Sequence, residues 1–326
     1  MNQTIDFDKV NGENISDYVN FEIHKNSFLM ENIERVTQLN FENSFKVIDD
    51  SFNSLEKASN STFILSWVSP DSLVRKKSLD GYDRIDSLKT SIFSNKKLFD
   101  RLQNYSISNE GKSISDKKMV LMNHIIEKFQ YSGVNLDSRE LKEYKNLLAD
   151  INKLSAEYSK NMNSSNQYLI LEKADIIGLP NNFTNKYRIE DGTYKIPVIN
   201  ATNGIIMNNA ELSEVRKSFL MKKLNIASDK NVVILDSLIS KRYQLAKVLD
   251  FNSYAAYNLF PKMAKTPERV WNFIDNLVLS TNNKAEQDMK ILIEARNLEK
   301  NTPHDVSPVK IWDFAYYNNL ILKNKY

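Results

Sequence analysis

The fold is decided by the stretch Ser138-Arg-Glu-Leu-Lys-Glu-Tyr-Lys-Asn-Leu-Leu-Ala-Asp-Ile-Asn-Lys-Leu-Ser-Ala-Glu-Tyr-Ser-Lys-Asn-Met162. Its apolar side chains recur at spacings of three and four, which aligns them on one face of an α-helix. Ser138 is the expected N-cap, with Glu140 as a favourable acid in the first turn. The stretch therefore predicts one long amphipathic helix.

The same periodicity runs through most of the chain on both sides of this helix. Before it, helical periodicity begins at Phe28, and a second helix from Phe41 to Leu55, capped by Asn40 or Asn43, would run antiparallel to the first. Further helices are predicted over residues 79–105, 115–132, 213–224, 231–249, 267–298 and from 308 to the end. Thr266-Pro267-Glu268 is a good helix start, because Thr suits the N-cap and Pro the first helical position.

One segment breaks the helical pattern. Residues 186–198 alternate apolar and polar side chains around Asp191-Gly192, which is the signal of a β-hairpin. The predicted fold class is therefore all-α with one small β-hairpin near 186–198. The predicted organisation is an N-terminal tail, residues 1–27, followed by one helical region, 28–326, with room for a further boundary near 163–205.

Composition agrees with this fold class and limits the partners. Aromatic residues make up 10% and charged residues 26% of the 326 residues, and only 7 are glycine, which is a helix-rich globular profile. The 44 basic and 41 acidic residues leave a net charge of +3, too small to indicate nucleic acid or an anionic membrane as partner.

The absence of cysteine excludes disulfides and thiolate chemistry. The first twenty residues are polar rather than signal-like, and no apolar run approaches the roughly 18 residues that span a bilayer. The expected location is the cytoplasm.

The search for catalytic motifs excludes several classes of enzyme. The glycines are too far apart for a GxGxxG loop, a Walker loop or a Gly-x-Ser-x-Gly elbow. The sequence also lacks His-Glu-x-x-His, in which two histidines on one helix face bind zinc and the glutamate activates water. We therefore predict no catalytic, cofactor-binding or metal-binding residues in this chain.

The remaining candidates have simpler structural interpretations. His24, His124 and His304 are expected at the surface or in a loop, and His124 with Glu127 is a conceivable metal half-site but more simply an exposed helix pair. The adjacent acids Asp49-Asp50 and Glu190-Asp191 are interpreted as helix surface and as turn residues. Trp312 with Tyr316, and the methionines Met119, Met122 and Met263, are expected to fill the core.

An ordered series of short segments carries a resemblance to a known family. The segments are Phe41-Glu42-Asn43-Ser44 with Ser54-Leu55-Glu56-Lys57, Asn95-Lys96-Lys97-Leu98-Phe99, residues 129–136, Ile177-Gly178-Leu179-Pro180, residues 241–251, Tyr254-Ala255, residues 262–270, Trp312-Asp313 and Tyr316-Tyr317. Together they resemble the N-terminal half of the thimet oligopeptidase family of zinc metallopeptidases, which includes neurolysin, oligopeptidase A and dipeptidyl carboxypeptidase. The order and spacing agree over roughly residues 28–326.

This resemblance implies a neurolysin-like helical region that forms one wall of a deep, narrow channel for short peptides. The catalytic half of that family would carry zinc on two histidines and a glutamate, and none of those positions exists here. The chain by itself is thus expected to be inactive and to bind no zinc, with the missing catalytic half as its partner. Its last helix reaches Tyr326 without a Gly or Asn cap, which we interpret as the end of a truncated or split gene product.

Two alternatives remain open at this point. The chain could be a stand-alone helical scaffold that binds peptides or a protein partner without enzymatic activity, or an enzyme with unrecognised chemistry. In a severed half, the face meant for the catalytic half should remain an apolar patch larger than about 600 Å². In a stand-alone scaffold, that face should be polar or paired.

Overall fold

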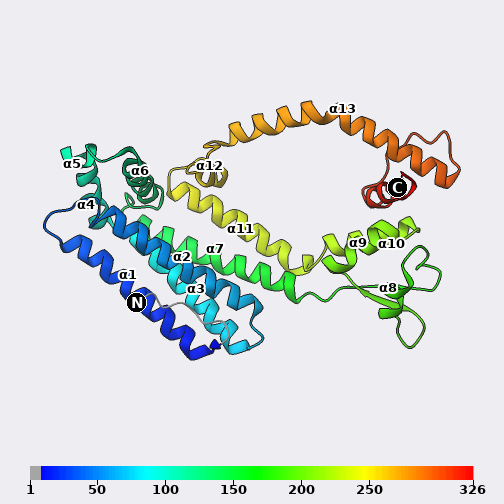
Figure 1. Ribbon diagram of the computed structural model, residues 1–326, viewed down its shortest axis with the longest axis horizontal. Coiled ribbons are helices and arrows are strands. Elements are labelled where there is room, and N and C mark those ends of the chain that lie inside the picture. Colours follow the sequence, from blue (N-terminus) through cyan, green and yellow to red (C-terminus); the bar gives the residue numbers. More distant parts are fainter. Residues whose placement is uncertain (1–8, 326) are drawn as a thin grey trace. The chain divides into compact units, whose positions relative to one another are not determined.

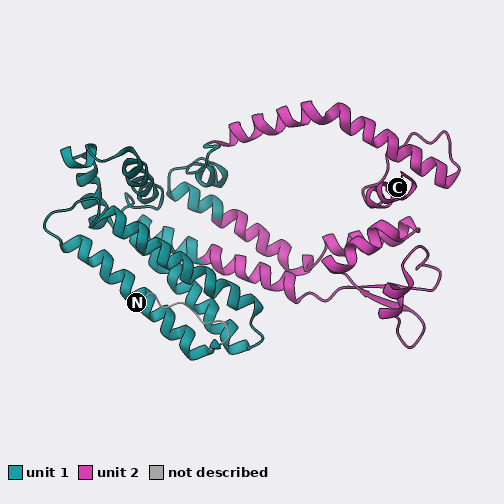
Figure 2. Cartoon of the chain, in the orientation of Figure 1, with its two compact units in different colours: residues 1–149, 242–265 teal, residues 150–241, 266–326 magenta. Residues whose placement is uncertain are grey.

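The computed structural model describes residues 9–325, which form helices and one two-stranded sheet (Figure 1). The chain divides into two compact units (Figure 2): unit 1 comprises residues 1–149 and 242–265, and unit 2 comprises residues 150–241 and 266–326. The predicted fold class, all-α with a small β-hairpin, is confirmed.

The elements of unit 1 are helices joined by short connections. They are α1 (Gly12–Arg35), α2 (Phe45–Val68), α3 (Ser72–Phe93), α4 (Lys96–Ile107), α5 (Asn109–Lys112), α6 (Asp116–Tyr131), the first part of α7 (Ser138–Ser164), the end of α11 (Ser228–Val248) and α12 (Tyr254–Leu259). Helices α1, α2 and α3 pack together, and α4 and α6 complete the unit's apolar core.

The core of unit 1 is rich in aromatic rings. Phe129 of α6 is fully buried, with its ring centroid 4.9 Å from that of Phe93 and 5.7 Å from that of Phe99. Helices α1 and α3 approach closely at Gly81, where a Cβ would lie 2.7 Å from Val19 Cγ2. A side chain at position 81 would therefore force these two helices apart.

The first helix starts earlier than the sequence pattern predicts. Helix α1 begins at Gly12, not near Phe28, and its N-cap Asn11 forms a reciprocal capping box with Asn14. Ile15 and Val19 belong to the core, so residues 12–27 are not a tail, and residues 1–8 of the predicted tail lie outside the described residues. The early turns were missed because polar residues interrupt their apolar stripe.

Helix α7 matches its predicted extent but has a different cap. Asp137, rather than Ser138, accepts hydrogen bonds from the backbone N–H groups of Arg139 (2.8 Å) and Glu140 (2.8 Å). The Glu140 carboxylate in turn accepts from the backbone N–H of Asp137. These bonds lower the pKa of Asp137, because the ionised carboxylate is the better acceptor.

Unit 2 contains the two strands and the remaining helices. In chain order they are the last part of α7, β1 (Tyr168–Leu171), α8 (Asn181–Lys186), β2 (Tyr194–Pro197), α9 (Asn200–Asn209), α10 (Ser213–Leu224), the first part of α11, α13 (Pro267–Lys300) and α14 (Phe314–Lys325). Sequence periodicity predicted α10 to the residue, whereas α8, α9 and, in unit 1, α12 were too short to be predicted.

The β-segment has the predicted turn and a second pairing. The Asp191 carboxylate accepts from the Thr193 backbone N–H (2.8 Å), and Gly192 has a φ of 86°, which a residue with a side chain seldom adopts. One bridge joins Arg188 to Tyr194 across this turn. The main antiparallel partner of β2 is β1, in register Leu169 with Ile196.

Helix α13 begins as predicted from its sequence. The Thr266 side chain accepts from the backbone N–H of Arg269, and Pro267 occupies the first turn. The helix ends at Asn301, which adopts the left-handed conformation with a φ of 52°. No helix within residues 9–325 combines the length and apolar character that crossing a bilayer requires.

Candidate functional site

The polar centre of unit 2 is built around the segment Trp312–Tyr317, at the start of α14. Asp313, Tyr316 and Tyr317 are buried although each carries a polar group. Trp312 is partly buried against the core of the unit. The core interpretation of Trp312 and Tyr316 is therefore confirmed, and their polar atoms need partners inside the protein.

Asp313 pairs with Arg216 of α10, a residue only 1% exposed. Arg216 Nε lies 2.9 Å from Asp313 Oδ1, and Nη2 donates to the same oxygen. Arg216 Nη1 donates to the carbonyl oxygens of Ala210 and Glu211. The guanidinium carbon also lies 4.1 Å from the ring centroid of Tyr316. The buried cation thus has a counter-ion, carbonyl acceptors and an aromatic face.

Ser213 also contacts the Asp313 carboxylate, and Trp312 in turn contacts Ser213. The Ser213 hydroxyl lies 2.8 Å from Oδ1 and 3.0 Å from Oδ2 of Asp313, to which it donates. Trp312 Nε1 donates to Ser213 Oγ at 3.0 Å. The carboxylate therefore has donors on both oxygens, all from this unit.

Glu299, near the end of α13, accepts hydrogen bonds from two tyrosines of α14. Tyr317 Oη lies 3.0 Å from Glu299 Oε2, and Tyr316 donates to Oε1. Burial, followed by the bond to Glu299, raises the pKa of both tyrosines. Both phenols therefore stay protonated at neutral pH and act as donors rather than as proton acceptors.

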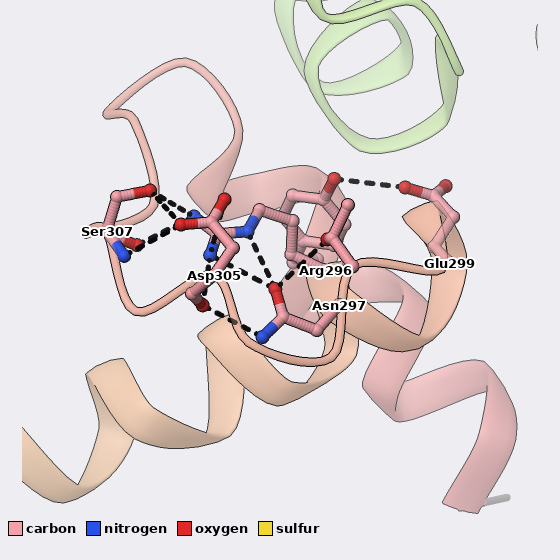
Figure 3. Close-up of polar contacts among 7 residues, drawn as sticks. Arg296, Asn297, Glu299, Asp305 and Ser307 are labelled. Atoms are coloured by element: carbon pink, nitrogen blue, oxygen red, sulfur yellow. Dashed lines mark hydrogen bonds and ion pairs between the residues drawn. The ribbon is translucent and has the colours of Figure 1, made fainter.

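The loop after α13 is held by Arg296 (Figure 3). Arg296 Nη2 lies 3.1 Å from the Asp305 carboxylate and 2.8 Å from the Asp305 carbonyl oxygen, and Nη1 lies 2.6 Å from the Ser307 carbonyl oxygen. Asn297 donates to the same Asp305 carbonyl at 2.9 Å. Hydrogen bonds from Ser307, more than the nearby Arg296 charge, lower the pKa of Asp305. These contacts fix the path of the chain from α13 into α14.

This polar centre can position helices, but its groups are already occupied by one another. A general acid or base must reach a substrate proton directly or through one water. Arg216 and Asp313 are both buried and bonded within the chain, so neither meets that condition. The arrangement supports a structural role for the motif residues.

The histidines do not form a zinc site. His24 on α1, His124 on α6 and His304 in the loop after α13 are all exposed and lie on separate elements. Within residues 9–325, no group of three or more His, Cys, Asp and Glu side chains is arranged to hold a metal ion. Residues 9–325 therefore do not fit a catalytic zinc, which needs three protein ligands and an open position.

The other residues singled out in the sequence are placed as follows. Asp49 and Asp50 lie exposed on α2 with Lys46, and Asp191 serves the turn, as predicted. Met122 is buried and Met119 packs against the core, as predicted. Met263 is 95% exposed, so its prediction as core filler was wrong, because it lies in a turn after α12.

Sequence reasoning missed Arg216, Arg296 and Glu299. The signal available was indirect: an aspartate inside an aromatic segment, Asp313, requires a buried cation, but the sequence does not say which of the 44 basic residues supplies it. Arg216 lies 97 positions from Asp313 along the chain. Only the fold brings the two together.

The N-terminal part of α13 is exposed around its whole circumference. Every residue from 271 to 288 is exposed, while the segment from Met289 onward packs against α14. The exposed large apolar side chains of this part are Trp271 (63%), Phe273 (67%), Ile274, Leu277, Val278 and Leu279 (76%). We call these six side chains the α13 apolar face. Such a set is unusual for a helix with no partner.

Comparison with known proteins identifies relatives among peptidases. A model of peptidase family M3 matches residues 206–326, which contain the polar centre and the α13 apolar face. The chain is 25% identical over 251 residues to a probable thimet oligopeptidase from Arabidopsis thaliana, covering 77% of this chain and 34% of that protein. It is 22% identical over 304 residues to saccharolysin from Saccharomyces cerevisiae, covering 90% of this chain and 42% of that protein.

A third relative is a mitochondrial intermediate peptidase from Yarrowia lipolytica, 24% identical over 212 residues, with 65% of this chain and 27% of that protein covered. The chain thus spans less than half the length of these relatives. Similarity to this family implies zinc as the cofactor of the complete enzymes. The described residues of this chain provide no site for it. Over residues 206–326 the chain is similar to peptidase family M3, and over longer stretches it is similar to a probable thimet oligopeptidase and to saccharolysin.

Proposed function

We propose that this chain is the N-terminal, channel-wall portion of a zinc oligopeptidase that hydrolyses short peptides, and that it is inactive without a separate catalytic portion. The observation that carries the proposal is a combination. Residues 206–326 match peptidase family M3, yet the whole sequence lacks His-Glu-x-x-His. A family member without that motif has no zinc ligands to activate water.

The α13 apolar face supports the need for a further portion. A helix in water is marginal on its own, and most helical stability in proteins comes from packing an apolar face. Residues 271–288 have no such packing within the described part of unit 2. We propose that the catalytic portion covers this face, since the relatives contain more than half of their length outside the matched region.

In this proposal the chain contributes binding and exclusion rather than chemistry. The polar centre holds α10, α13 and α14 together through Arg216, Asp313 and Glu299. Rigid helices of this kind can form a wall that admits an extended peptide and excludes a folded protein. The zinc and the general base would both come from the catalytic portion.

The cellular location belongs to the proposal as well. The sequence favours the cytoplasm, whereas several relatives are named mitochondrial intermediate peptidases. Fractionation of cells that express the tagged chain, with detection in the cytosolic and mitochondrial fractions, distinguishes the two locations.

The test of the proposed function uses the coding DNA and the purified chain. Reading the DNA beyond the codon for Tyr326 is expected to reveal a His-Glu-x-x-His frame, in phase or shifted. Co-expression of that segment is expected to give cleavage of an internally quenched short peptide that a chelator abolishes. A control in which both histidines of that motif are replaced by alanine should give none. If the chain alone cleaves the peptide, the proposal is wrong; if it binds peptides tightly without any catalytic segment, the stand-alone scaffold replaces it.

A further inference from the structure

Unit 1 contains a cavity of about 190 Å³ that the proposed peptidase role does not use. It lies among α2, α3, α6 and the start of α7, and all its lining residues belong to unit 1. The charged side chains of its wall are two acids and two lysines, namely Glu56, Asp86, Lys89 and Lys128. Because these four charges balance, the wall favours a neutral ligand over an anion or a cation.

The cavity is small and lies at the surface. The side chains of Glu56 and Asp86 in its wall are 51% and 34% exposed. Sites for drug-sized ligands have about 300–1,000 Å³, and this cavity has about 190 Å³. It therefore suits a small molecule that enters from solvent.

Lys89, one of the two lysines of the wall, is held by carboxylates. Its Nζ lies 3.0 Å from Glu56 Oε1 and 3.7 Å from Asp86 Oδ1. Its side chain is only 16% exposed. The N–H groups of Lys89 thus have charged acceptors, and they are not free for a ligand.

Lys128, the other lysine, lies against two aromatic rings instead. Its Nζ is 4.4 Å from the ring centroids of both Phe52 and Phe93, which also line the cavity. The faces of these rings attract an ammonium group, but they supply no acceptor for its N–H groups. Within residues 9–325, Lys128 forms no ion pair and no side-chain hydrogen bond.

The surroundings of Lys128 favour its neutral form more than water does. Burial lowers the pKa of Lys128 most strongly; Glu56 of α2 opposes this change, and Lys89 of α3 adds to it. The other titratable groups of the wall are Asp86 of α3 and Tyr144 of α7. Since only the neutral amine carries a lone pair, a lowered pKa makes Lys128 a better nucleophile at neutral pH.

A desolvated lysine beside a second cation is an arrangement that proteins use to form imines with carbonyl compounds. A small aldehyde is neutral, as the wall requires, and its carbonyl oxygen can accept from the free N–H groups of Lys128. We propose that Lys128 captures small aliphatic aldehydes as an imine within this cavity. The amine nitrogen bonds to the carbonyl carbon, and the carbonyl oxygen leaves as water with the two amine hydrogens. A C=N bond remains, and no oxidant or reductant is consumed.

This site is separate from the proposed peptidase role. All its groups belong to unit 1 and none of them lies in the polar centre of unit 2. Failure of the peptidase assay would leave the aldehyde site untouched, and the reverse also holds.

The test is reductive trapping on the full chain. The chain is incubated with propanal and sodium cyanoborohydride, which fixes each imine as an alkylamine, and peptide mass spectrometry gives the rate at each lysine. At about pH 7, Lys128 is expected to react at least about threefold faster than the exposed Lys117 of the same helix, because a fall of one pKa unit raises the neutral fraction of an amine about tenfold. Lys89, held by two carboxylates, should react more slowly than Lys117. Lys128 reacting no faster than Lys117 or Lys89 would overturn the proposal.

A larger aldehyde tests whether the cavity is the site. The ratio of the rate at Lys128 to the rate at Lys117 is measured again with pyridoxal in place of propanal. The ratio should fall below one, because the cavity does not admit the substituted ring whereas the exposed Lys117 does. A ratio as high with pyridoxal as with propanal would contradict capture inside the cavity.

One substitution and a change of pH test the source of the reactivity. Glu56→Gln removes the carboxylate that opposes the lowered pKa, so the ratio with propanal should rise by about twofold or more. The control is Glu31→Gln in the exposed Glu31–Arg35 pair, which should leave the ratio unchanged. At about pH 10 the ratio for the wild type should fall, because the neutral fraction of an ordinary lysine then rises as well. With the fold confirmed by circular dichroism, a ratio that responds to neither change would contradict the proposal.

Discussion

Arg216 Nε and Asp313 Oδ1 lie 2.9 Å apart across 97 positions of the chain, and both side chains are buried. Their ion pair joins α10 to the start of α14. The pair accounts physically for the Trp312-Asp313 and Tyr316-Tyr317 motif: Asp313 binds the guanidinium, Tyr316 stacks on it, and Tyr317 reaches Glu299. The motif thus holds α10, α13 and α14 together within the region that matches the family.

Replacement of Asp313 tests how much the buried Arg216–Asp313 ion pair stabilises the protein. Asp313→Ala leaves the Arg216 charge buried without its counter-ion, so we expect the free energy of unfolding to fall by about 3–5 kcal/mol. Urea unfolding followed by circular dichroism measures the change. The matched control is Glu31→Ala, which removes one partner of the exposed Glu31–Arg35 pair and should change the stability by less than about 1 kcal/mol. Equal effects of the two substitutions would show that the buried pair contributes little.

Two glycines of unit 2 should respond oppositely to alanine. Gly178 has a φ of 84°, and a Cβ there would lie 2.3 Å from the carbonyl oxygen of Asn209. Gly178→Ala should therefore destabilise the protein by more than about 1 kcal/mol. Gly204 lies inside α9 with no atom near the position of a Cβ, so Gly204→Ala should stabilise it by about 0.5–1 kcal/mol. Thermal unfolding of both variants measures the difference; a stabilising Gly178→Ala would contradict the described turn.

Lys128 should give the stability of the chain a measurable pH dependence. Because burial lowers its pKa, the unfolded chain holds this proton more tightly than the folded chain. Below the lowered pKa the folded chain carries the buried charge, which reduces its free energy of unfolding. This destabilisation disappears as the pH rises toward the ordinary pKa of 10.5. The charged groups that face Lys128 are Glu56, Asp86 and Lys89.

The comparison is between the wild type and Lys128→Met, which lacks the titrating group. Urea unfolding at about pH 7 and about pH 10 should show the wild type gaining stability relative to the variant at the higher pH. A difference that stays constant, or shifts in favour of the variant, would mean that Lys128 is not desolvated as described.

The α13 apolar face should make the isolated chain associate. Replacing Trp271 and Leu277 together by glutamine removes exposed apolar surface without touching the core. We expect less self-association by sedimentation velocity and less binding of a hydrophobic dye, with a change in unfolding free energy of less than about 1 kcal/mol. Asn276→Gln on the same helix is the control and should change neither readout. If the double variant self-associates as much as the wild type, the α13 apolar face is not the surface through which the chain associates.

The sequence predicted the elements whose signals are local. Thr266-Pro267 marks the start of α13 because capping depends on a few adjacent residues, and α10 was predicted from its helical periodicity. The start of α1 was placed too late, since Glu22 and Asn26 face its buried side, where an apolar stripe was expected. Buried polar residues of this kind are satisfied by Ser51 and Ser54 of α2, which no local pattern reveals.

Long-range relationships could not be predicted from one sequence. The pairing of β2 with β1 depends on how the intervening α8 folds back, and the partner of Asp313 depends on how α10 and α14 pack. The aromatic environment of Lys128 likewise joins α2, α3 and α6. In each case the residue types were visible, but their proximity is a property of the fold.

The most direct measurement of the central claim is the zinc content of the purified chain at neutral pH, determined by elemental analysis beside an assay on an internally quenched short peptide. The account predicts no stoichiometric zinc and no cleavage by the chain alone, because its three histidines are exposed and lie on separate elements. One tightly bound zinc per chain, with cleavage that a chelator abolishes, would contradict it.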